Sequence, residues 1–147
     1  MLTNTDLPAT TILIIDGNQT DREYYARRLR MFSPDYLIIE AKDGATGLDV
    51  YRSRRIDCVL LELDLPDQSG FQVLIDLVPL ARKPEAAVIV LTSLSQSSLH
   101  ELAKRNGALG CFIKRYTTEE ILDYAIRKAI AFVGPSLKEQ RQFRFAR

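Results

Sequence analysis

The sequence contains no tryptophan, one histidine and two cysteines in 147 residues. Cys58 and Cys111 both lie inside apolar segments, and the sequence has no Cys-X-X-Cys pair or histidine–cysteine cluster that would bind zinc. Each is therefore expected to be a free, buried thiol in a reducing compartment. His100 stands among polar residues of an expected helix, and no neighbour in the sequence would make it a catalytic base.

The chain also lacks an excess of charge and a long apolar run. Its 20 Lys and Arg residues nearly balance 19 Asp and Glu residues, so no overall field attracts nucleic acid or an anionic membrane. No apolar segment approaches the ~20 residues of a membrane span, and residues 1–11 have no feature of a signal peptide. The sequence predicts a cytoplasmic domain that binds neither membrane nor nucleic acid, and any charged site must be local.

Short apolar segments alternate with segments of helical spacing along the chain. The expected strands are residues 11–15, 36–40, 57–61, 86–91 and 110–113. The expected helices run from a cap at Thr20 or Asp21 to Phe32, over 45–52, 71–80 and 95–105, and from a cap at Thr117 or Thr118 to Val133. This alternation predicts an α/β fold of the flavodoxin-like (βα)5 type, with a doubly wound parallel sheet of five strands. Residues 1–10 are interpreted as a lead, 11–133 as the domain, and 134–147 as a tail or linker.

Polar residues close four of the expected strands. Asp16, Glu62, Thr92 and Lys114 each follow a different apolar segment. The carboxyl ends of parallel strands meet at one edge of the sheet, where ligands of such folds bind. Carboxylates, a hydroxyl and an ammonium group at one place suit a metal ion and a phosphate-like anion. These four residues are therefore the candidate site.

The same motifs resemble the receiver domains of two-component response regulators. The resemblance covers about Thr10 to Val133 and rests on Ile12 to Asp16, on Leu60 to Pro66 with Gly70, on Thr92 and on Lys114. It implies transfer of a phosphoryl group from a histidine kinase to an aspartate at the end of the third strand. It also implies that two acidic residues after the first strand hold Mg²⁺ with a backbone carbonyl. The Thr and Lys would bind the acyl phosphate.

The sequence departs from this family pattern at the reacting groups. Glu62 stands at the acceptor position, Gly17 replaces the second acidic residue, Arg115 replaces the proline after the lysine, and Cys111 replaces the switch aromatic. The extra methylene of Glu62 moves its carboxylate, and a displacement of about 1 Å can cost ~100-fold in rate.

These departures predict a pseudo-receiver that signals through protein interactions and is not an enzyme. Without an acidic side chain at position 17, Mg²⁺ would rely on Asp16, with Asp64 as a further candidate ligand, so the metal site is expected to be weak or absent. Glu62 is expected to approach Lys114 and Thr92 and to imitate a phosphoryl group in part. Asp67 is interpreted as a residue of a solvated loop.

Other functions remain open at this level. A histidine kinase could still phosphorylate the domain, at Glu62 or at Asp64. The segment from Asp16 to Thr20 loosely resembles the nucleophile loop of haloacid-dehalogenase-like phosphohydrolases, although Asn18 stands where the catalytic acid should be. A nucleic-acid-binding regulator would require an output domain after Arg147.

The resemblance also implies where a partner binds. In the family, the face formed by the fourth helix, fifth strand and fifth helix binds partners or a second copy. The residues expected on this face are Leu99, Ala103, Cys111, Tyr124 and Arg127. Arg27, Arg28 and Arg30 of the first helix are interpreted as a solvated basic face that could also dock a partner helix.

Overall fold

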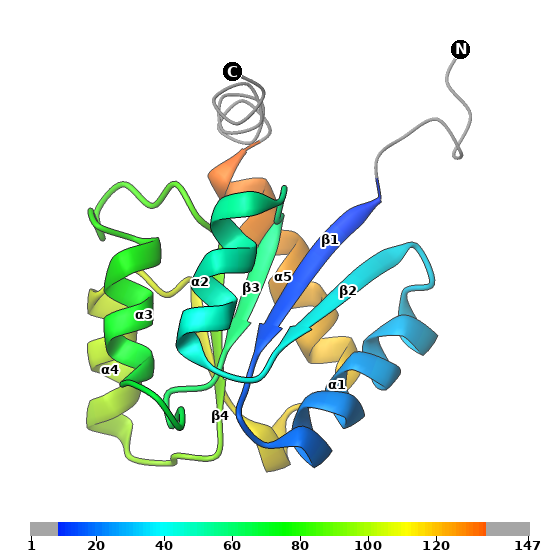
Figure 1. Cartoon of the computed structure of the whole chain (residues 1–147), viewed down its shortest axis with the longest axis horizontal. Coiled ribbons are helices and arrows are strands. Elements are labelled where there is room, and N and C mark those ends of the chain that lie inside the picture. Colours follow the sequence, from blue (N-terminus) through cyan, green and yellow to red (C-terminus); the bar gives the residue numbers. More distant parts are fainter. Residues whose placement is uncertain (1–8, 135–147) are drawn as a thin grey trace.

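The computed structural model describes residues 9–134 (Figure 1). The predicted lead and tail therefore lie almost wholly outside the described residues. The elements in chain order are β1 (Thr10–Ile15), α1 (Gln19–Phe32), β2 (Tyr36–Ala41), α2 (Gly44–Ser53), β3 (Cys58–Leu61), α3 (Gly70–Leu77), β4 (Val88–Thr92), α4 (Ser97–Arg105), β5 (Gly110–Ile113), the 3-10 turn η1 (Lys114–Tyr116) and α5 (Glu119–Val133). None of the helices within residues 9–134 has the length and apolar character needed to cross a membrane.

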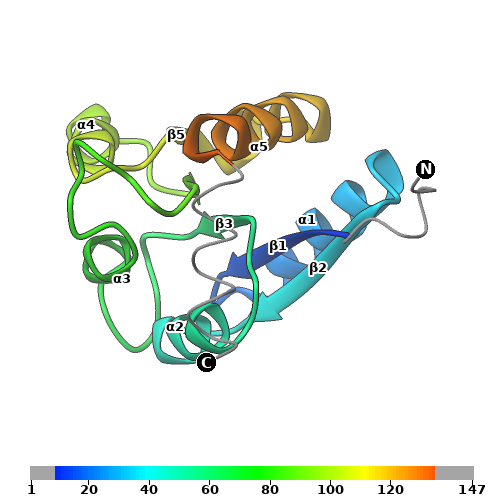
Figure 2. The same cartoon turned by 90° about the horizontal axis from the view of Figure 1, so that it is seen from above.

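The five strands form one parallel sheet in the order β2-β1-β3-β4-β5. Helices α1 and α5 cover one face of the sheet, and α2, α3 and α4 cover the other (Figure 2). The central strands read as unbroken apolar runs because both of their faces are buried. Leu13 and Val59 face one core, whereas Ile12 and Leu60 face the other. The predicted flavodoxin-like (βα)5 fold is confirmed.

Several predicted boundaries were wrong by a few residues. Helix α1 is capped by Asn18, whose side chain accepts a hydrogen bond from the Asp21 N–H at 3.0 Å, and not by Thr20 or Asp21. Helix α3 ends at Leu77 and not at residue 80. The residue before a proline is pushed towards extended backbone, and Val78, which precedes Pro79, has φ −128° and ψ 75°. The prediction of Thr118 as a cap of α5 is confirmed, since its side chain accepts from the Ile121 N–H at 3.2 Å.

Candidate functional site

The carboxyl ends of the strands bring the four predicted site residues to one edge of the sheet. Ile15 of β1 pairs with Leu61 of β3, so Asp16 and Glu62 leave the sheet side by side. Thr92 is the last residue of β4, and Lys114 directly follows β5. All four side chains are buried, with 8% or less of their surface exposed.

The Lys114 ammonium group is the centre of this cluster. Its Nζ lies 2.7 Å from Asp16 Oδ2, 2.8 Å from Asp21 Oδ2 and 3.0 Å from Glu62 Oε1. Burial alone would lower the pKa of Lys114, but hydrogen bonds to Asp16 and Asp21 and the charges of Asp16 and Glu62 outweigh burial and raise it. The surroundings of Lys114 therefore favour its charged form.

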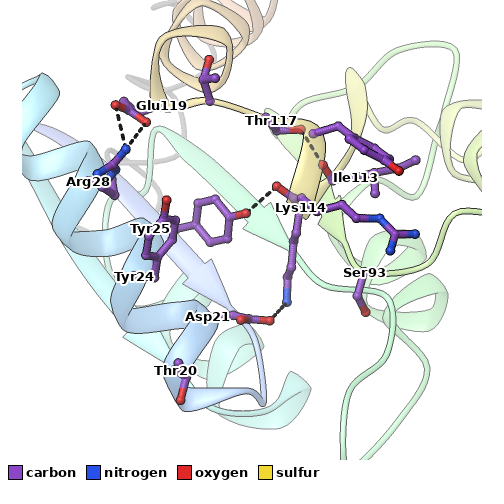
Figure 3. A pocket seen from close by; sticks show the side chains of 13 residues that line it. Thr20, Asp21, Tyr24, Tyr25, Arg28, Ser93, Ile113, Lys114, Thr117 and Glu119 are labelled. Atoms are coloured by element: carbon purple, nitrogen blue, oxygen red, sulfur yellow. Dashed lines mark hydrogen bonds and ion pairs between the residues drawn. The ribbon is translucent and has the colours of Figure 1, made fainter.

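Asp21 was missed by sequence reasoning because it does not follow a strand. It lies in the first turn of α1, which the Asn18 cap holds over the end of the sheet (Figure 3). One turn later, the Tyr25 hydroxyl donates to the Lys114 carbonyl oxygen at 2.7 Å. Helix α1 thus fixes both the backbone and the side chain of Lys114.

Both oxygens of Glu62 accept several hydrogen bonds. Oε2 accepts from the Leu63 N–H at 2.7 Å and the Asp64 N–H at 3.3 Å. Oε1 accepts from the Ser93 N–H at 3.2 Å, besides its ion pair with Lys114. Burial would raise the pKa of Glu62, but a hydrogen bond from Thr92, the charge and hydrogen bond of Lys114, and the Ser93 N–H hold it below its ordinary value. Glu62 is a buried, ionised carboxylate with its oxygens already occupied.

The residues at this edge do not fit a Mg²⁺ site. Asp16 uses Oδ1 to accept the Asn18 N–H at 2.9 Å and Oδ2 to bind Lys114. Burial raises the pKa of Asp16, although Lys114 partly offsets this effect. Asp64, the other candidate ligand, has an exposed side chain. Within residues 9–134, no three His, Cys, Asp or Glu side chains are arranged to hold a metal ion.

Gly17 stands where the resemblance implied a second acidic residue, and Pro66 leaves no room for a side chain there. A Cβ atom added to Gly17 would lie 2.7 Å from Pro66 Cδ, which is closer than real Cβ contacts. A carboxylate at position 17 therefore requires movement of the loop that contains Pro66.

Asp57 is a second carboxylate beside β3, but at the other end of the strand. It precedes Cys58, and its Oδ2 accepts the Thr11 N–H at 2.8 Å near the start of β1. Its Oδ1 lies 3.6 Å from Arg55. Asp57 therefore belongs to the amino edge of the sheet, opposite to Lys114.

Asp67 in the loop before α3 and His100 in α4 have structural roles that the sequence did not reveal. Asp67 is exposed, as expected of a solvated loop, but its carboxylate also accepts the Gly44 and Ala45 N–H groups, each at 2.9 Å. These bonds lower the pKa of Asp67 and satisfy free donors at the start of α2. His100 is half-buried, and its Nε2 lies 2.8 Å from the Leu94 carbonyl oxygen in the β4–α4 loop.

The predicted partner face needs correction at two residues. Ala103 is fully buried, because it belongs to the stripe of α4 that packs on the core. Arg127 points to the α1 side of α5, where Nε lies 3.0 Å from Asp123 Oδ2 and Nη2 lies 3.2 Å from Ser33 Oγ. Cys111 is half-buried, and burial raises the pKa of its thiol to about 11. Tyr124 is 68% exposed, as expected of a docking residue.

Several exposed apolar side chains lie along α5, beside the edge strand β5. Ile121, Tyr124 and Phe132 are 46%, 68% and 69% exposed. They line a groove of about 470 Å³ whose other residues are Leu109, Phe112, Ala125, Lys128 and Ala129. The lining of this α5–β5 groove is mainly apolar.

A second, more polar pocket lies beside the Lys114 cluster. It has a volume of about 710 Å³ and is lined by residues of α1, η1 and the start of α5 (Figure 3). Arg28 lines this pocket, and its Nη2 lies 3.3 Å from Glu119 Oε1 at the start of α5. Arg28, one of the three arginines of the predicted basic face, therefore forms an ion pair with α5. Arg27 and Arg30 are exposed, and Arg30 lies 3.9 Å from Glu40.

Asp123 is the centre of a buried polar network that sequence reasoning missed. It is 7% exposed and accepts hydrogen bonds from the hydroxyls of Ser33, at 2.9 Å, and Tyr36. Arg127 completes the network and stacks over the Tyr36 ring at 5.3 Å. The network joins α5 to the turn between α1 and β2.

Comparisons with known proteins agree with this architecture. The sequence profile of the response regulator receiver domain matches residues 12–126. The chain is 28% identical to Protein PilH of Pseudomonas aeruginosa over 76% of its own length and 90% of that protein. It is 25% identical to the transcriptional regulatory protein DegU of Brevibacillus brevis, over 86% of its own length and about half (53%) of that protein.

Solved structures give the same result. A response regulator receiver domain from Clostridium thermocellum is 26% identical, with a TM-score of 0.72 over 83% of this chain and 94% of that chain. A receiver domain from Colwellia psychrerythraea, 20% identical, has a TM-score of 0.74 over 83% of this chain and 98% of that chain, which shows the shared fold. The match over residues 12–126 and the convergence of Asp16, Thr92 and Lys114 lead to one conclusion: the chain belongs to the response regulator receiver domain family.

Proposed function

We propose that this receiver domain transmits its signal by protein–protein interaction and that Glu62 occupies the phosphoacceptor position, so that phosphorylation in the usual way does not occur. The observation that carries the proposal is the place of Glu62. It leaves β3 at the edge of the sheet where Lys114 lies, 3.0 Å from its carboxylate. Asp57, the aspartate nearest in sequence, lies at the opposite end of β3.

The hydrogen bonds of Glu62 support this reading. Phosphorylation would form a bond from phosphorus to a carboxylate oxygen, as the bond from phosphorus to the donor's leaving group breaks, and that oxygen now accepts bonds from Lys114, Ser93 or Leu63. Each of these donors is held by the surrounding backbone or by a buried ion pair, so attack by Glu62 on a phosphoryl donor requires several bonds to break first. The carboxylate supplies about one negative charge where a phosphoryl group would add about 1.5 to 2. Glu62 thus keeps the side chains of the site in one arrangement without being phosphorylated.

Phosphorylation can be tested directly. The protein is incubated with acetyl phosphate and Mg²⁺, and its intact mass is measured; no phosphoryl adduct is expected. An adduct that disappears in Glu62→Ala, in Asp64→Ala or in Asp57→Asn would overturn the proposal and identify the acceptor. Glu101→Ala, at an exposed glutamate of α4, is the matched control.

The same preparation tests the phosphohydrolase alternative. Release of phosphate from p-nitrophenyl phosphate that is lost in Asp16→Asn would contradict a purely binding function. We expect no release, because both oxygens of Asp16 are occupied by Asn18 and Lys114.

We further infer that the α5–β5 groove binds the same groove of a second copy. The charges of α5 support this choice. Glu120 and Lys128 are both exposed. Glu120 lies four residues, about one helical turn, before the exposed Tyr124, and Lys128 lies four residues after it. Residues four apart share one face of a helix. Antiparallel pairing of two α5 helices around Tyr124 therefore places each Glu120 beside the partner's Lys128.

The oligomeric state tests this interface. Light scattering after size-exclusion chromatography is expected to show a dimer that Tyr124→Glu converts to a monomer. Tyr116→Glu, at a tyrosine that is 70% exposed in η1, should leave the dimer intact. Glu120→Lys should weaken the dimer, and Glu120→Lys with Lys128→Glu should restore it. A monomeric wild-type protein at high concentration would contradict this interface, as would a dimer that survives Tyr124→Glu.

A further inference from the structure

We propose that the Lys114 side chain is the built-in cation of this receiver domain, and that Asp21 is the additional carboxylate that holds it there, so that the site takes no divalent metal ion. The proposal concerns the metal dependence of the domain. It stands or falls separately from the absence of phosphorylation and from the dimer interface.

Every N–H donor of the Lys114 ammonium group has a hydrogen-bond acceptor. An ammonium group has three N–H donors and no acceptor. Three carboxylates lie within hydrogen-bonding distance of Nζ: Asp16 from the end of β1 at 2.7 Å, Asp21 from α1 at 2.8 Å and Glu62 from the end of β3 at 3.0 Å. Each donor of Lys114 therefore has one carboxylate, and no donor is left over for another anion.

The cluster needs a cation. Like charges brought together in a buried site oppose ionisation unless an opposite charge lies within about 4 to 6 Å. Asp16 and Glu62 are 4% exposed, so water screens them little. The ammonium group of Lys114 supplies the positive charge at the point where the three carboxylates meet.

A divalent ion competes poorly for the same oxygens. Mg²⁺ requires near-octahedral coordination by oxygens at about 2.0 to 2.1 Å. Here, Asp16 Oδ1 is committed to the Asn18 N–H, and Glu62 Oε2 is committed to the Leu63 N–H. Gly17 offers no side-chain oxygen, and Pro66 leaves no room for one. A metal ion would also have to share these carboxylates with Lys114, whose positive charge repels it at such short distances.

Asp21 distinguishes this arrangement from an ordinary strand-edge ion pair. It is partly exposed, at 37% of its side chain, and an ion pair of that kind at a surface contributes little on its own. Its carboxylate nevertheless reaches Lys114 because Asn18 holds the first turn of α1. We assign Asp21 as a positioning residue that draws the ammonium group into the centre of the cluster.

The experiment measures metal binding by the full chain. Mn²⁺ is added to ¹⁵N-labelled protein, broadening of amide signals is recorded, and affinity is measured by calorimetry with Mg²⁺ and Mn²⁺. In the wild type, the signals of Gly17 and Leu63 should not broaden, and the melting temperature should be the same with Mg²⁺ and with EDTA. Specific broadening there, or a melting temperature raised by Mg²⁺, would overturn the proposal.

Removal of the ammonium group should let the three carboxylates move together into a metal site, although no three acidic side chains within residues 9–134 are arranged to hold a metal ion as they stand. Lys114→Met keeps a similar chain length without the charge and leaves three carboxylates around the vacated point. It should bind Mn²⁺ at least about tenfold more tightly than the wild type, because oxygen-rich clusters are the sites such ions prefer. Adding Asp21→Asn to Lys114→Met should reverse most of the gain. Lys83→Met, at an exposed lysine between α3 and β4, is the matched control and should leave Mn²⁺ binding unchanged.

Each result decides the question. A folded Lys114→Met variant that binds Mn²⁺ no better than wild type contradicts the role of Lys114 as a built-in cation. Binding that is equally tight in the double variant contradicts the role of Asp21. If Lys114→Met is unfolded alone, recovery of its circular dichroism spectrum on addition of Mn²⁺ supports the proposal, and no recovery overturns it.

Discussion

Replacement of Asp123 by alanine should cost this domain a large part of its stability. Asp123 accepts hydrogen bonds from Ser33 and Tyr36, and its other oxygen binds Arg127. Asp123→Ala leaves the two hydroxyls without this acceptor in a place where Asp123 itself is 7% exposed. A buried polar group left without its partner costs about 1 to 3 kcal/mol. With two such groups, and with the exposed Arg127 adding little, we expect a loss of about 3 kcal/mol in the free energy of unfolding.

Two further substitutions separate the contributions to this loss. Asp123→Asn keeps an oxygen that can accept from one hydroxyl, so it should cost about 1 to 2 kcal/mol. Asp76→Ala, at an exposed carboxylate of α3, is the control and should change stability by less than about 0.5 kcal/mol. Urea unfolding followed by circular dichroism measures all three variants. The argument is that Asp123→Ala leaves two buried hydroxyls without an acceptor. A loss of unfolding free energy below about 1 kcal/mol for Asp123→Ala, or equal losses for Asp123→Ala and Asp123→Asn, would refute it.

Three other changes have definite expected outcomes. The pKa of Glu62 is lowered by folding, so its contribution to stability is present above the ordinary carboxyl pKa and is lost as the pH falls through the lowered value. Glu62→Gln should therefore flatten the acid side of a plot of unfolding free energy against pH; an unchanged acid side would contradict the assignment. Asp67→Ala removes the acceptor for Gly44 and Ala45 and should cost about 1 kcal/mol in urea unfolding, whereas a neutral result would mean that α2 does not need this bond. Gly17→Ala should lower the melting temperature, corresponding to about 1 to 3 kcal/mol, because its Cβ meets Pro66; the same melting temperature in both proteins would show that the loop moves freely.

The sheet could be predicted from sequence because its strands are buried on both faces. Segments such as Cys58 to Leu61 consist only of apolar residues, and the first polar residue after each marks its end. The convergence of Asp16 and Glu62 then follows from parallel pairing alone. Helix boundaries were harder to predict, because Asn18 and Thr20 are both chemically able to cap a helix and only the backbone at each position decides between them.

The missed residues depend on contacts between distant helices. Asp21 has no strand-end signal, and its role requires the first turn of α1 to lie beside Lys114, 93 residues further along the chain. Asp123 and Arg127 are four residues apart on α5, a spacing typical of a solvated ion pair, so nothing local indicated a buried network. Ala103 was placed on the docking face because the resemblance implied that the fourth helix forms part of it, and only the packing of α4 shows that Ala103 faces the core.

The contact between Gly17 and Pro66 bears on which substitutions this edge of the sheet tolerates. Glu62→Asp alone would shorten one carboxylate but provide no further metal ligand. A side chain at position 17 would meet the proline ring, since even a Cβ atom would lie 2.7 Å from Cδ. The contact therefore couples position 17 to the loop between β3 and α3: an acidic residue at position 17 and the loop that carries Pro66 have to change together.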